Sequence, residues 1–412
     1  MIKASIVSIG NELLNGQTAD TNARYLSGRL VELGIGVVSG YTATDDTNAI
    51  VRSVRLALGD ADVVLVTGGL GPTDDDVTRE ALAKLLGSEL RLKDELLEQI
   101  EEFFRERKRP MAEKNRVQAY LPEGCEALRN HIGTAPGIMA VTEGKRIFVL
   151  PGVPSEMERM FEESVAARLR ALAGEQAIFV KKLRCFGTGE SNIAEMLDTL
   201  MERGRNPLVN STANGGVITL TIFGSGANRT EAEKIVKKVE KIIRSRLGNI
   251  IFGDGGETLA EVVGRKLAET GRTVAVAESC TGGLLGKLLT DVPGSSRYFT
   301  QGWIAYSNTA KVRELGVNAG LIESWGAVSE EVATAMAHGA RKKAESDFAI
   351  GITGIAGPEG GSEQKPVGVV YISVASATGV ETERYVFAGG RDSVRLRAAL
   401  TALNMLRSQL RI

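Results

Sequence analysis

The sequence predicts two α/β domains with parallel sheets, joined by a small α+β module. The chain has 412 residues, which is too long for one ordinary hydrophobic core. Strand-like and helix-like segments alternate over roughly the first 170 residues and again from Thr258 onward. Between these regions the order changes to strand, helix, two strands and helix, which is typical of a small α+β module.

The N-terminal domain is predicted over residues 1–172. Its first strand, KASIVSIG, ends at Gly10, and VVSGYTA and DVVLVTGG supply two more strands. Asp20 is expected to cap one helix start, and Asp45 and Asp46 can start the next helix; apolar residues follow at helical spacing in both cases. A charged helix is expected from about Lys93 to Arg107, followed by RIFVLPGVPSEM and another helix. This alternation indicates a parallel sheet with helices on both faces.

The middle module is predicted over residues 176–252. IFVKKLRCF is strand-like, SNIAEMLDTLM is helix-like, and NPLVNST with GGVITLTIF is interpreted as a hairpin. The helix TEAEKIVKKVEKIIRSRL carries apolar residues on one face and lysines around the other. We interpret it as a solvated amphipathic helix rather than an RNA contact. FGDGGE, at residues 252–257, is interpreted as a linker or turn.

The C-terminal domain is predicted over residues 255–412. A helix in TLAEVVGRKLAETG precedes strands in TVAVAES, QGWIAYS, DFAIGITG and GVVYISVAS, with helices between most of them. RYVFAGG then leads into the helix DSVRLRAALTALNML. The alternation again predicts a parallel α/β sheet.

The composition argues against several classes of protein. The formal net charge is −1, so the chain has no overall field that would favour nucleic acid or a membrane surface. Cys125, Cys185 and Cys280 lie far apart without metal-ligand spacing, so neither a zinc site nor a disulfide framework is expected. No apolar run approaches the roughly 20 residues of a membrane span, and the N-terminus lacks the pattern of a signal peptide. We therefore expect a cytoplasmic protein.

Polar residues of the C-terminal domain recur where a predicted strand ends or the next helix begins. Ser279 follows VAVAE, Tyr306 ends QGWIAY, and Thr353 ends DFAIGI. Lys311 lies in the helix start after Tyr306, and Arg391 lies at the helix start after RYVFAGG. Because ligands bind outside the carboxyl ends of strands in open α/β sheets, these side chains are expected to share one crevice.

Three candidate nucleophiles, Ser279, Cys280 and Thr281, adjoin one another at the first of these turns. The chain has only 2 histidines, one in the other domain and one inside a predicted helix, so a serine–histidine–aspartate triad is not expected. Lys311, helped by the Tyr306 hydroxyl, is a candidate base for Ser279 if burial or a nearby cation lowers its pKa from about 10.4. Cys280 has no histidine to activate it and is interpreted as a packing residue. The residues alone leave catalysis and a purely binding role open.

The turn after Ser279 also has the features of an anion site. Thr281, Gly282 and Gly283 open a predicted helix, and the N–H groups at a helix start attract a phosphate. The helix start at Arg391 offers the same kind of site.

The loop TGGLGPTDDDVT, at residues 67–78, has a separate set of candidate ligands. Gly68, Gly69 and Gly71 permit close backbone approach, and Thr73 offers a hydroxyl. The loop nevertheless lacks the GK[ST] ending of a nucleotide-binding P-loop.

The three consecutive aspartates of this loop, Asp74, Asp75 and Asp76, would repel a phosphate unless a cation such as Mg²⁺ intervened. They are also suited to capping the helix that follows. We assign Asp76 to capping and Asp75 to metal or ligand binding.

Several segments of the C-terminal domain resemble, nearly word for word, the CinA C-terminal family of nicotinamide mononucleotide deamidases. These segments are AESCTGG, GSSRYFTQGWIAYSNTAK, GAVSE, GITGIAGPEGGSEQKPVG and FAGGRD. The resemblance implies hydrolysis of nicotinamide mononucleotide to nicotinic acid mononucleotide and ammonia. It makes Ser279 the nucleophile and Lys311 with Tyr306 the base system, without a metal.

The same resemblance implies a second group of residues around the substrate. Ser296 of GSS, Thr353 of ITG and Arg391 of GGRD would bind substrate or support the oxyanion.

Three N-terminal segments, GNELLNGQTADTNARYL, TGGLGPTDDDVT and LPGVPSEM, resemble the molybdopterin-binding fold of the CinA N-terminal domain. The whole chain thus resembles full-length CinA proteins. This implies a metal-dependent ADP-ribose pyrophosphatase that yields AMP and ribose 5-phosphate. Asn11, Glu12, Asp75 and Glu156 are the candidate contacts to a divalent cation, Mg²⁺ or similar, or to pyrophosphate. The same fold serves molybdenum-cofactor enzymes, so fold alone leaves the reaction open.

The resemblance also implies a KH-like middle module and a homodimer. FGTGES stands where a nucleic-acid-binding KH domain would carry a GxxG loop with basic neighbours, which argues against RNA binding. Two functional hypotheses follow. One is a bifunctional enzyme of pyridine-nucleotide salvage. The other is a nucleotide-binding accessory protein of competence or the DNA-damage response, with one active site or none.

Overall fold

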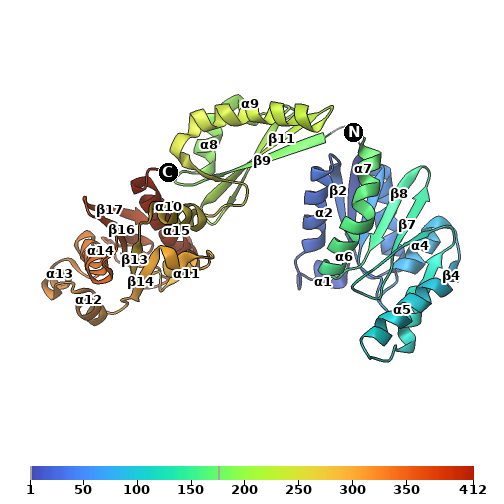
Figure 1. Ribbon diagram of the computed structural model, residues 1–412, viewed down its shortest axis with the longest axis horizontal. Coiled ribbons are helices and arrows are strands. Elements are labelled where there is room, and N and C mark those ends of the chain that lie inside the picture. Colours follow the sequence, from blue (N-terminus) through green and yellow to red (C-terminus); the bar gives the residue numbers. More distant parts are fainter. Residues whose placement is uncertain (1, 175–176) are drawn as a thin grey trace. The chain divides into compact units, whose positions relative to one another are not determined.

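The computed structural model of the chain describes residues 2–174 and 177–412. By their internal contacts, the residues group into two compact units, Met1–Val180 with Phe223–Lys237, and Lys181–Ile222 with Lys238–Ile412. The predicted fold class is confirmed: two α/β domains contain parallel strands, and a small α+β module has a sheet of its own (Figure 1). Met1 and Gln176, where the N-terminal domain and the middle module are predicted to begin, lie outside the described residues.

The N-terminal domain is built on a six-stranded sheet in the order β2-β1-β3-β8-β7-β6. Its strands are β1 (Lys3–Ile9), β2 (Gly36–Ala43), β3 (Val63–Thr67), β6 (Glu126–Leu128), β7 (Gly137–Thr142) and β8 (Lys145–Leu150). β1, β2, β3 and β8 run parallel, as predicted, but β7 is antiparallel to β8 and β6 is antiparallel to β7. The short turn at Glu143 and Gly144 explains this difference, because only antiparallel strands are joined by a tight hairpin.

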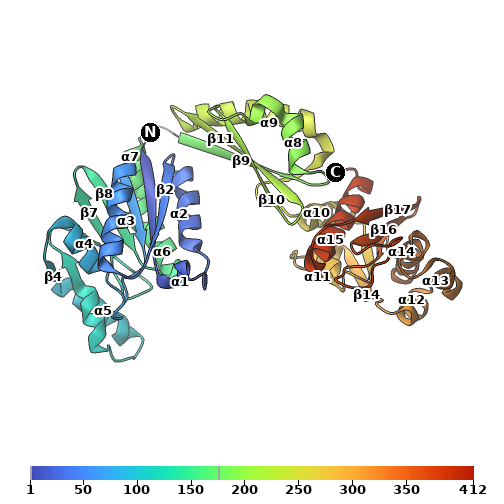
Figure 2. The same cartoon turned by 180° about the vertical axis from the view of Figure 1, so that it is seen from behind.

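Helices cover both faces of this sheet. They are α1 (Asn11–Leu14), α2 (Thr21–Glu32), α3 (Thr47–Asp60), α4 (Thr78–Leu86), α5 (Asp94–Glu106), α6 (Pro154–Met160) and α7 (Ala166–Ala173), with a short sheet of β4 (Leu90–Leu92) and β5 (Tyr120–Pro122). Alternate residues of β1 point to opposite faces. Val7 and Ile9 pack in the core with α3, α4 and α5, and Ala4 and Ile6 pack in the core with α2, α6 and α7 (Figure 2).

Asp20 and Asp46 cap helices in this domain as predicted, whereas the Asp45 carboxylate accepts from the Asn11 N–H at 2.9 Å instead. The Asp20 carboxylate accepts from the Ala23 N–H at 2.8 Å, at the start of α2. The Asp46 carboxylate accepts from the Asn48 and Ala49 N–H groups at 3.1 and 2.9 Å, at the start of α3. Both caps satisfy N–H groups that a helix start leaves without partners.

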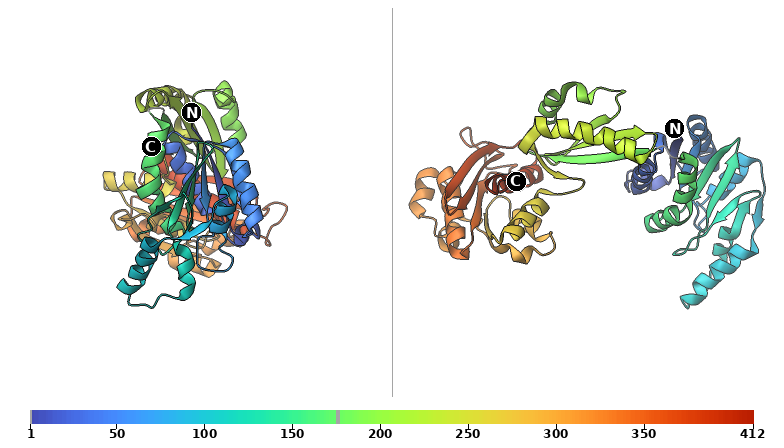
Figure 3. Two further views of the ribbon diagram at one scale, coloured as in Figure 1. Left: turned by 90° about the vertical axis from the view of Figure 1, so that its right-hand side faces the viewer. Right: turned by 45° about the horizontal axis from the view of Figure 1, so that its top comes forward.

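The middle module follows the predicted order of elements. These are β9 (Ala177–Cys185), α8 (Glu190–Leu197), β10 (Leu208–Asn214), β11 (Val217–Gly226), α9 (Arg229–Leu247) and β12 (Ile251–Asp254). The sheet order is β10-β11-β9-β12, and α9 runs along one face of this sheet (Figure 3). The segment predicted as a linker begins inside β12, which pairs antiparallel with β9. Local composition could not show this pairing, because it depends on a partner strand that is distant in the sequence.

The C-terminal domain has a five-stranded sheet in the order β14-β13-β15-β16-β17. The strands are β13 (Val274–Glu278), β14 (Phe299–Ile304), β15 (Phe348–Gly354), β16 (Val369–Ser376) and β17 (Gly379–Val386). β13 is parallel to β14 and β15. β16 is antiparallel to its neighbour β15, and β17 is antiparallel to its neighbour β16. The sheet is therefore parallel only in part, because a loop rather than a crossover helix joins β15 to β16.

Helices cover both faces of the C-terminal sheet as well. They are α10 (Leu259–Thr270), α11 (Leu284–Thr290), α12 (Asn308–Leu315), α13 (Ala319–Trp325), α14 (Glu330–Ala344) and α15 (Arg391–Gln409). Val276 of β13 packs in the core with α10, α11 and α15, and Ala277 packs in the core with α12 and α14. In the described part of the chain, no helix has both the length and the apolar character needed to cross a membrane.

Candidate active site

Ser279 directly follows β13, at the carboxyl edge of the C-terminal sheet. Its N–H donates to the Ile352 carbonyl of the neighbouring strand β15 at 3.0 Å, and its own carbonyl accepts from the Gly282 N–H at 3.1 Å. Ser279 is only 7% exposed. These two backbone hydrogen bonds fix the position of Ser279 at the end of the strand, and so fix where its Oγ begins.

Lys311 reaches Ser279 from the first turn of α12. Its Nζ is 3.0 Å from Ser279 Oγ, 3.0 Å from the Ala305 carbonyl oxygen and 3.1 Å from the Tyr306 carbonyl oxygen. Lys311 is 1% exposed, and burial lowers the pKa of its amine. All three of these polar neighbours are uncharged, so none of them supplies a counter-charge that would oppose this effect of burial.

The three contacts of Lys311 fix the position of its amine, and in each of them Nζ is the donor: to Ser279 Oγ and to the carbonyls of Ala305 and Tyr306. A neutral amine has two N–H donors and one lone pair. Once Lys311 is neutral, the two carbonyls can still accept both N–H groups, and the lone pair can then face Ser279 Oγ. This geometry is suited to removal of the Ser279 proton without a histidine.

Glu278, the last residue of β13, is a site residue that the sequence analysis missed. It is 1% exposed, and its carboxylate accepts from the N–H groups of Gly283, Leu285 and Gly286 at 3.0, 3.0 and 2.8 Å. Glu278 therefore occupies the start of α11, where an external anion was predicted, and Gly283 has no free N–H to offer. The available signal was an acidic residue at the end of a strand, a few residues before a glycine-rich helix start.

Arg395 of α15 contacts the turn that contains Thr281 and Gly282. The Thr281 carbonyl accepts from Arg395 Nε and Nη2 at 3.2 and 2.8 Å, and a Cβ on Gly282 would lie 3.4 Å from that Nη2. The Thr281 hydroxyl is buried and has no hydrogen-bond partner within the described residues. Arg395, which lies one helical turn after Arg391, is a second residue that the sequence analysis missed. Its contact with Thr281 connects the catalytic turn to the helix that begins with Arg391.

Tyr306 and Arg391 form a pair at the exposed side of the site. Tyr306 is 58% exposed, and Arg391 Nη2 donates to its hydroxyl at 3.2 Å. Arg391 Nη1 also donates to the Gly357 carbonyl at 2.8 Å. Among the described residues, the Tyr306 hydroxyl makes no hydrogen bond with Ser279 or Lys311, and only the Tyr306 carbonyl contacts Lys311. The structure thus pairs Tyr306 with Arg391 rather than with the base.

Two predicted substrate ligands have different positions. Thr353 ends β15 at the same edge as Ser279, but its buried hydroxyl donates to the Ala327 carbonyl at 2.7 Å. Ser296 lies in the turn before β14. Since β14 is parallel to β13, that turn is at the amino edge of the sheet, opposite Ser279. Within this chain the prediction that Ser296 shares the site is therefore wrong.

Cys280 is placed in the hydrophobic core beside α11 and α15. It is 5% exposed, and burial raises the pKa of its thiol to about 12. A thiol with such a high pKa carries little thiolate at neutral pH, which favours packing over nucleophilic attack.

At three glycines of the N-terminal loop, the absence of a Cβ leaves space for other atoms of the protein. A Cβ on Gly68 would lie 2.3 Å from the Ile9 carbonyl oxygen, and one on Gly69 would lie 2.1 Å from Thr78 Oγ1. A Cβ on Gly71 would lie 2.4 Å from a carboxylate oxygen of Asp76. Packing therefore accounts for these glycines, whether or not a ligand also approaches them.

Asp76 organises the same loop. Its carboxylate accepts from the Gly71 N–H at 2.8 Å, from the Thr73 N–H at 2.9 Å and from the Thr73 hydroxyl at 2.5 Å. These bonds support the structural assignment of Asp76 and leave the Thr73 hydroxyl already engaged. Asp75 is exposed, and a hydrogen bond with Thr73 lowers the pKa of its carboxyl, so it is ionised at neutral pH.

The four predicted metal contacts lie near the carboxyl ends of three parallel strands. Asn11 and Glu12 follow β1, Asp75 follows β3 and Glu156 follows β8. Glu156 Oε2 accepts from Asn130 Nδ2 at 2.7 Å. Within residues 2–174 and 177–412, no three histidine, cysteine, aspartate or glutamate side chains gather closely enough to hold a metal ion. The described residues thus place candidate oxygen ligands along one sheet edge without gathering three of them into a metal cluster.

The fold and the site define a class: an α/β protein with a buried serine–lysine pair at the edge of one sheet and a glycine-rich loop at the edge of another. Comparison with known families divides the chain into three parts. Residues 256–410 match the CinA C-terminal domain, residues 5–171 a probable molybdopterin binding domain, and residues 180–253 the damage-inducible protein CinA KH domain.

Similar proteins cover nearly the whole chain. A competence-damage inducible protein of Clostridium novyi (strain NT) is 42% identical over 409 residues, which is 99% of each chain. One from Caldicellulosiruptor saccharolyticus is 44% identical over 404 residues, or 98% of each chain. A CinA-like protein of Kosmotoga olearia is 42% identical over 409 residues, or 99% of each. The chain belongs to the CinA family.

Solved structures match part of the chain. The competence/damage inducible protein CihA from Agrobacterium tumefaciens is 40% identical, covers 37% of this chain and 94% of its own, and gives a TM-score of 0.37. CinA from Thermoplasma acidophilum, described as of unknown function, is 36% identical, covers 40% of this chain and 97% of its own, and gives a TM-score of 0.38.

Proposed function

We propose that the C-terminal domain is an amidohydrolase that converts nicotinamide mononucleotide to nicotinic acid mononucleotide and ammonia. The observation that carries this proposal is the 3.0 Å contact between Lys311 Nζ and Ser279 Oγ, made by a buried lysine whose pKa is lowered. A serine with a neutral lysine is sufficient for acyl transfer. The segment AESCTGG and its companions, which resemble CinA deamidases, support a nucleotide carboxamide as the substrate.

The proposed reaction proceeds through an acyl-enzyme. Neutral Lys311 takes the Oγ proton while Ser279 attacks the carboxamide carbon. The protonated lysine then delivers that proton to the amide nitrogen, the C–N bond breaks, and ammonia leaves. A water molecule next attacks the acyl carbon and gives a proton to Lys311, which returns it to Ser279 Oγ as the acid is released.

The neighbouring residues would position the substrate. Glu278 holds the turn after Ser279, and Arg395 holds the Thr281 carbonyl, so the nucleophile is fixed before substrate binds. Arg391 is exposed at the same edge and would attract the phosphate of a mononucleotide. The Tyr306 hydroxyl, 3.2 Å from Arg391 Nη2, would orient that guanidinium.

The proposal is tested by comparing Ser279→Ala with Cys280→Ala, two adjacent changes at the same turn. Ammonia release from nicotinamide mononucleotide should fall to the background level in Ser279→Ala and stay near that of the unchanged protein in Cys280→Ala. Circular dichroism and thermal unfolding would verify that both variants are folded. Unchanged deamidation in Ser279→Ala would overturn the proposed nucleophile.

For the N-terminal domain we propose hydrolysis of ADP-ribose to AMP and ribose 5-phosphate. The observation in favour is that Asn11, Glu12, Asp75 and Glu156 follow strands at one sheet edge, where α/β sheets bind ligands. Mg²⁺ is commonly held by one or two carboxylates together with substrate phosphates, so dispersed carboxylates suit it. One or two of the carboxylates of Glu12, Asp75 and Glu156, together with the substrate phosphates, would hold the cation, which would offset the charge of the pyrophosphate.

This second activity is tested by measuring AMP formation from ADP-ribose with Mg²⁺ and with a chelator. Turnover that requires the cation and falls in Asp75→Asn would support it. Tight nucleotide binding by calorimetry without turnover at either site would instead favour a nucleotide-binding accessory protein.

A further inference from the structure

A cavity lies where the middle module packs against the C-terminal domain, within the second compact unit. Its volume is about 260 Å³, and none of its lining residues belongs to the Ser279 site. Most of its wall is apolar and consists of Val217, Phe252, Leu259, Leu288, Leu400 and Leu403. An engineered apolar cavity of about 150 Å³ binds benzene, so this cavity has room for a six-membered ring with a substituent.

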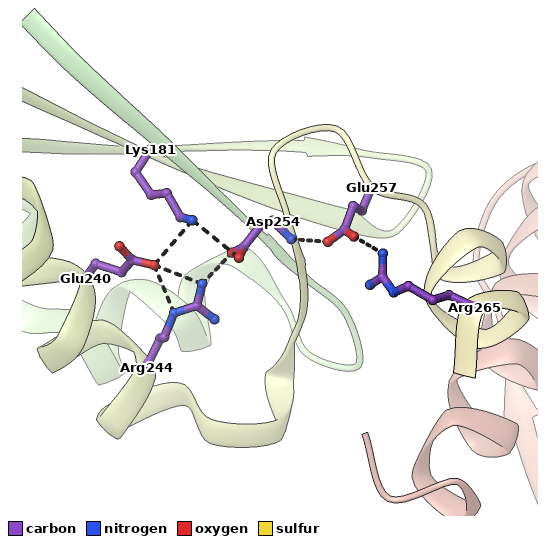
Figure 4. A network of polar contacts seen from close by, with 6 residues as sticks. All are labelled: Lys181, Glu240, Arg244, Asp254, Glu257 and Arg265. Atoms are coloured by element: carbon purple, nitrogen blue, oxygen red, sulfur yellow. Dashed lines mark hydrogen bonds and ion pairs between the residues drawn. The ribbon is translucent and has the colours of Figure 1, made fainter. Parts of the chain in front are cut away.

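Ion pairs hold the segment that forms one wall of this cavity (Figure 4). Asp254, at the end of β12, contacts Arg244 and lies 3.3 Å from Lys181 Nζ. Glu257 accepts from the Asp254 N–H at 2.7 Å and from Arg265 Nη1 at 2.6 Å. The segment from β12 to α10 is therefore tied to β9 and α9 at one end and to α10 at the other. A wall held in this way makes the cavity preformed, which lowers the cost of binding.

Arg184 is the cation that lines the cavity. Its Nη1 donates to Thr219 Oγ1 at 2.7 Å. Its Nε is buried and has no hydrogen-bond partner in the described part of the chain. Within the described residues, the side-chain partner of this partly buried guanidinium is a neutral hydroxyl, and no carboxylate forms an ion pair with it. A buried N–H without an acceptor is also costly.

The two acidic residues that line the cavity are engaged elsewhere. Glu261 accepts from the Thr258 N–H and hydroxyl at 2.7 and 2.9 Å, in the capping box of α10. Asp291 accepts from Lys287 Nζ at 2.5 Å. Among the described residues, neither carboxylate makes a hydrogen bond or an ion pair with Arg184.

We propose that this cavity binds a small organic acid with a compact apolar body, its carboxylate facing Arg184. The apolar wall would cover the body of the ligand. The carboxylate would supply the acceptor and the counter-charge that Arg184 lacks, in a charge-assisted hydrogen bond. The site is independent of the proposed deamidase activity, because it shares no residue with it.

Calorimetric titration of the full-length protein with cyclohexanecarboxylate tests the proposal. This probe has a saturated ring and does not mimic a nicotinamide. Saturable binding with one site per chain is expected, and Arg184→Met should weaken it at least about tenfold, because a hydrogen bond to a charged group is lost. Cyclohexylmethanol, which has the same body without the charge, should bind at least about tenfold more weakly than the acid.

Three variants serve as controls. Arg297→Met removes an exposed arginine from the same unit and should leave the affinity unchanged, which excludes a general charge effect. Ser279→Ala should also bind the acid normally. Leu288→Trp, which fills the cavity, should abolish binding; if it fails to fold, Arg184→Met decides the question. Absence of saturable binding, equal affinity for the alcohol, or unchanged affinity in folded Arg184→Met would each overturn the proposal.

Discussion

The two α/β domains place their candidate sites at the same topological position, but the sites differ in how far they are assembled. At the C-terminal edge, Ser279, Lys311 and Glu278 are buried and already make hydrogen bonds to fixed partners. At the N-terminal edge, Glu12 and Asp75 are exposed.

The difference follows from the chemistry proposed for each site. Burial disfavours the charge of a lysine and so helps it act as a base near neutral pH, which explains why the deamidase site is closed and preorganised. A pyrophosphate and its cation bring charges of their own, so an open surface of oxygen ligands is sufficient. Substitutions at the two sheet edges test this contrast.

Replacement of Lys311 should have the largest effect. Lys311→Ala should lower kcat for ammonia release by about 10²–10⁴-fold, the usual contribution of a general base. Lys311→Arg should lose as much, since a guanidinium keeps its proton. Lys287→Ala, which removes an exposed lysine of α11, is the matched control and should retain activity. Substantial deamidation by Lys311→Arg would contradict the role of a neutral amine.

Gly68→Ala should destabilise the N-terminal domain by about 3 kcal/mol or more, because its Cβ would lie 2.3 Å from the Ile9 carbonyl at a φ of 104°. Gly16→Ala, at φ 69° with nothing within 4 Å, should cost much less. Calorimetric unfolding would measure both changes. Deamidation should survive in both variants, and loss of deamidation in Gly68→Ala would contradict the independence of the two sites.

Glu278→Gln should lower kcat for deamidation about tenfold while KM changes little. The amide has one oxygen in place of two, so at least one of the three N–H groups that the carboxylate now satisfies loses its acceptor. The turn that carries Ser279 then loosens without loss of substrate contacts. Steady-state kinetics would separate the two parameters, and a change confined to KM would argue for a binding role instead.

The pH dependence of deamidation should report the lowered pKa of Lys311. The neutral amine is the active form, so kcat/KM should rise with pH and level off below about 10.4, the ordinary value for lysine. Because the folded state releases this proton more readily than the unfolded state, folding stability should also rise with pH between the lowered pKa and about 10.4. Lys311→Met should remove this contribution to stability, as measured by urea unfolding at several pH values.

The smallest effects are expected from the two aspartates of the N-terminal loop. Asp76→Asn should cost about 1 kcal/mol, because its carboxylate accepts three hydrogen bonds within the loop. Asp75→Asn should leave stability unchanged and impair only ADP-ribose hydrolysis. Urea unfolding and AMP formation would measure the two properties, and the reverse pattern would exchange the roles of these residues.

The sequence was sufficient to place Ser279 and Lys311 near the carboxyl ends of two strands, because apolar runs locate the strands and the topology locates their carboxyl ends. It could not predict that the carbonyls of Ala305 and Tyr306 hold Lys311 Nζ, since those contacts depend on how the chain turns after β14. Nor could it show that the Tyr306 hydroxyl turns to Arg391, which follows a strand far along the chain.

Some misses had a signal in the sequence. Ser296 precedes its strand, so strand direction alone placed it at the opposite edge from Ser279. Glu278 is an acidic residue that ends a strand next to a glycine-rich helix start, and an acid close to a helix start is favoured by the helix dipole. The antiparallel strands β16 and β17 follow from the connections, because a loop and then a short turn cannot carry a parallel crossover.

The central claim, that Lys311 is a neutral base for Ser279, is tested most directly by NMR titration of its side chain. The ¹³Cε signal of ¹³C-labelled lysine would be assigned by its absence in Lys311→Arg and followed with pH in the folded protein. A pKa clearly below about 10.4, the ordinary value for lysine, is predicted. A lysine that stays protonated up to or beyond that value would contradict the claim.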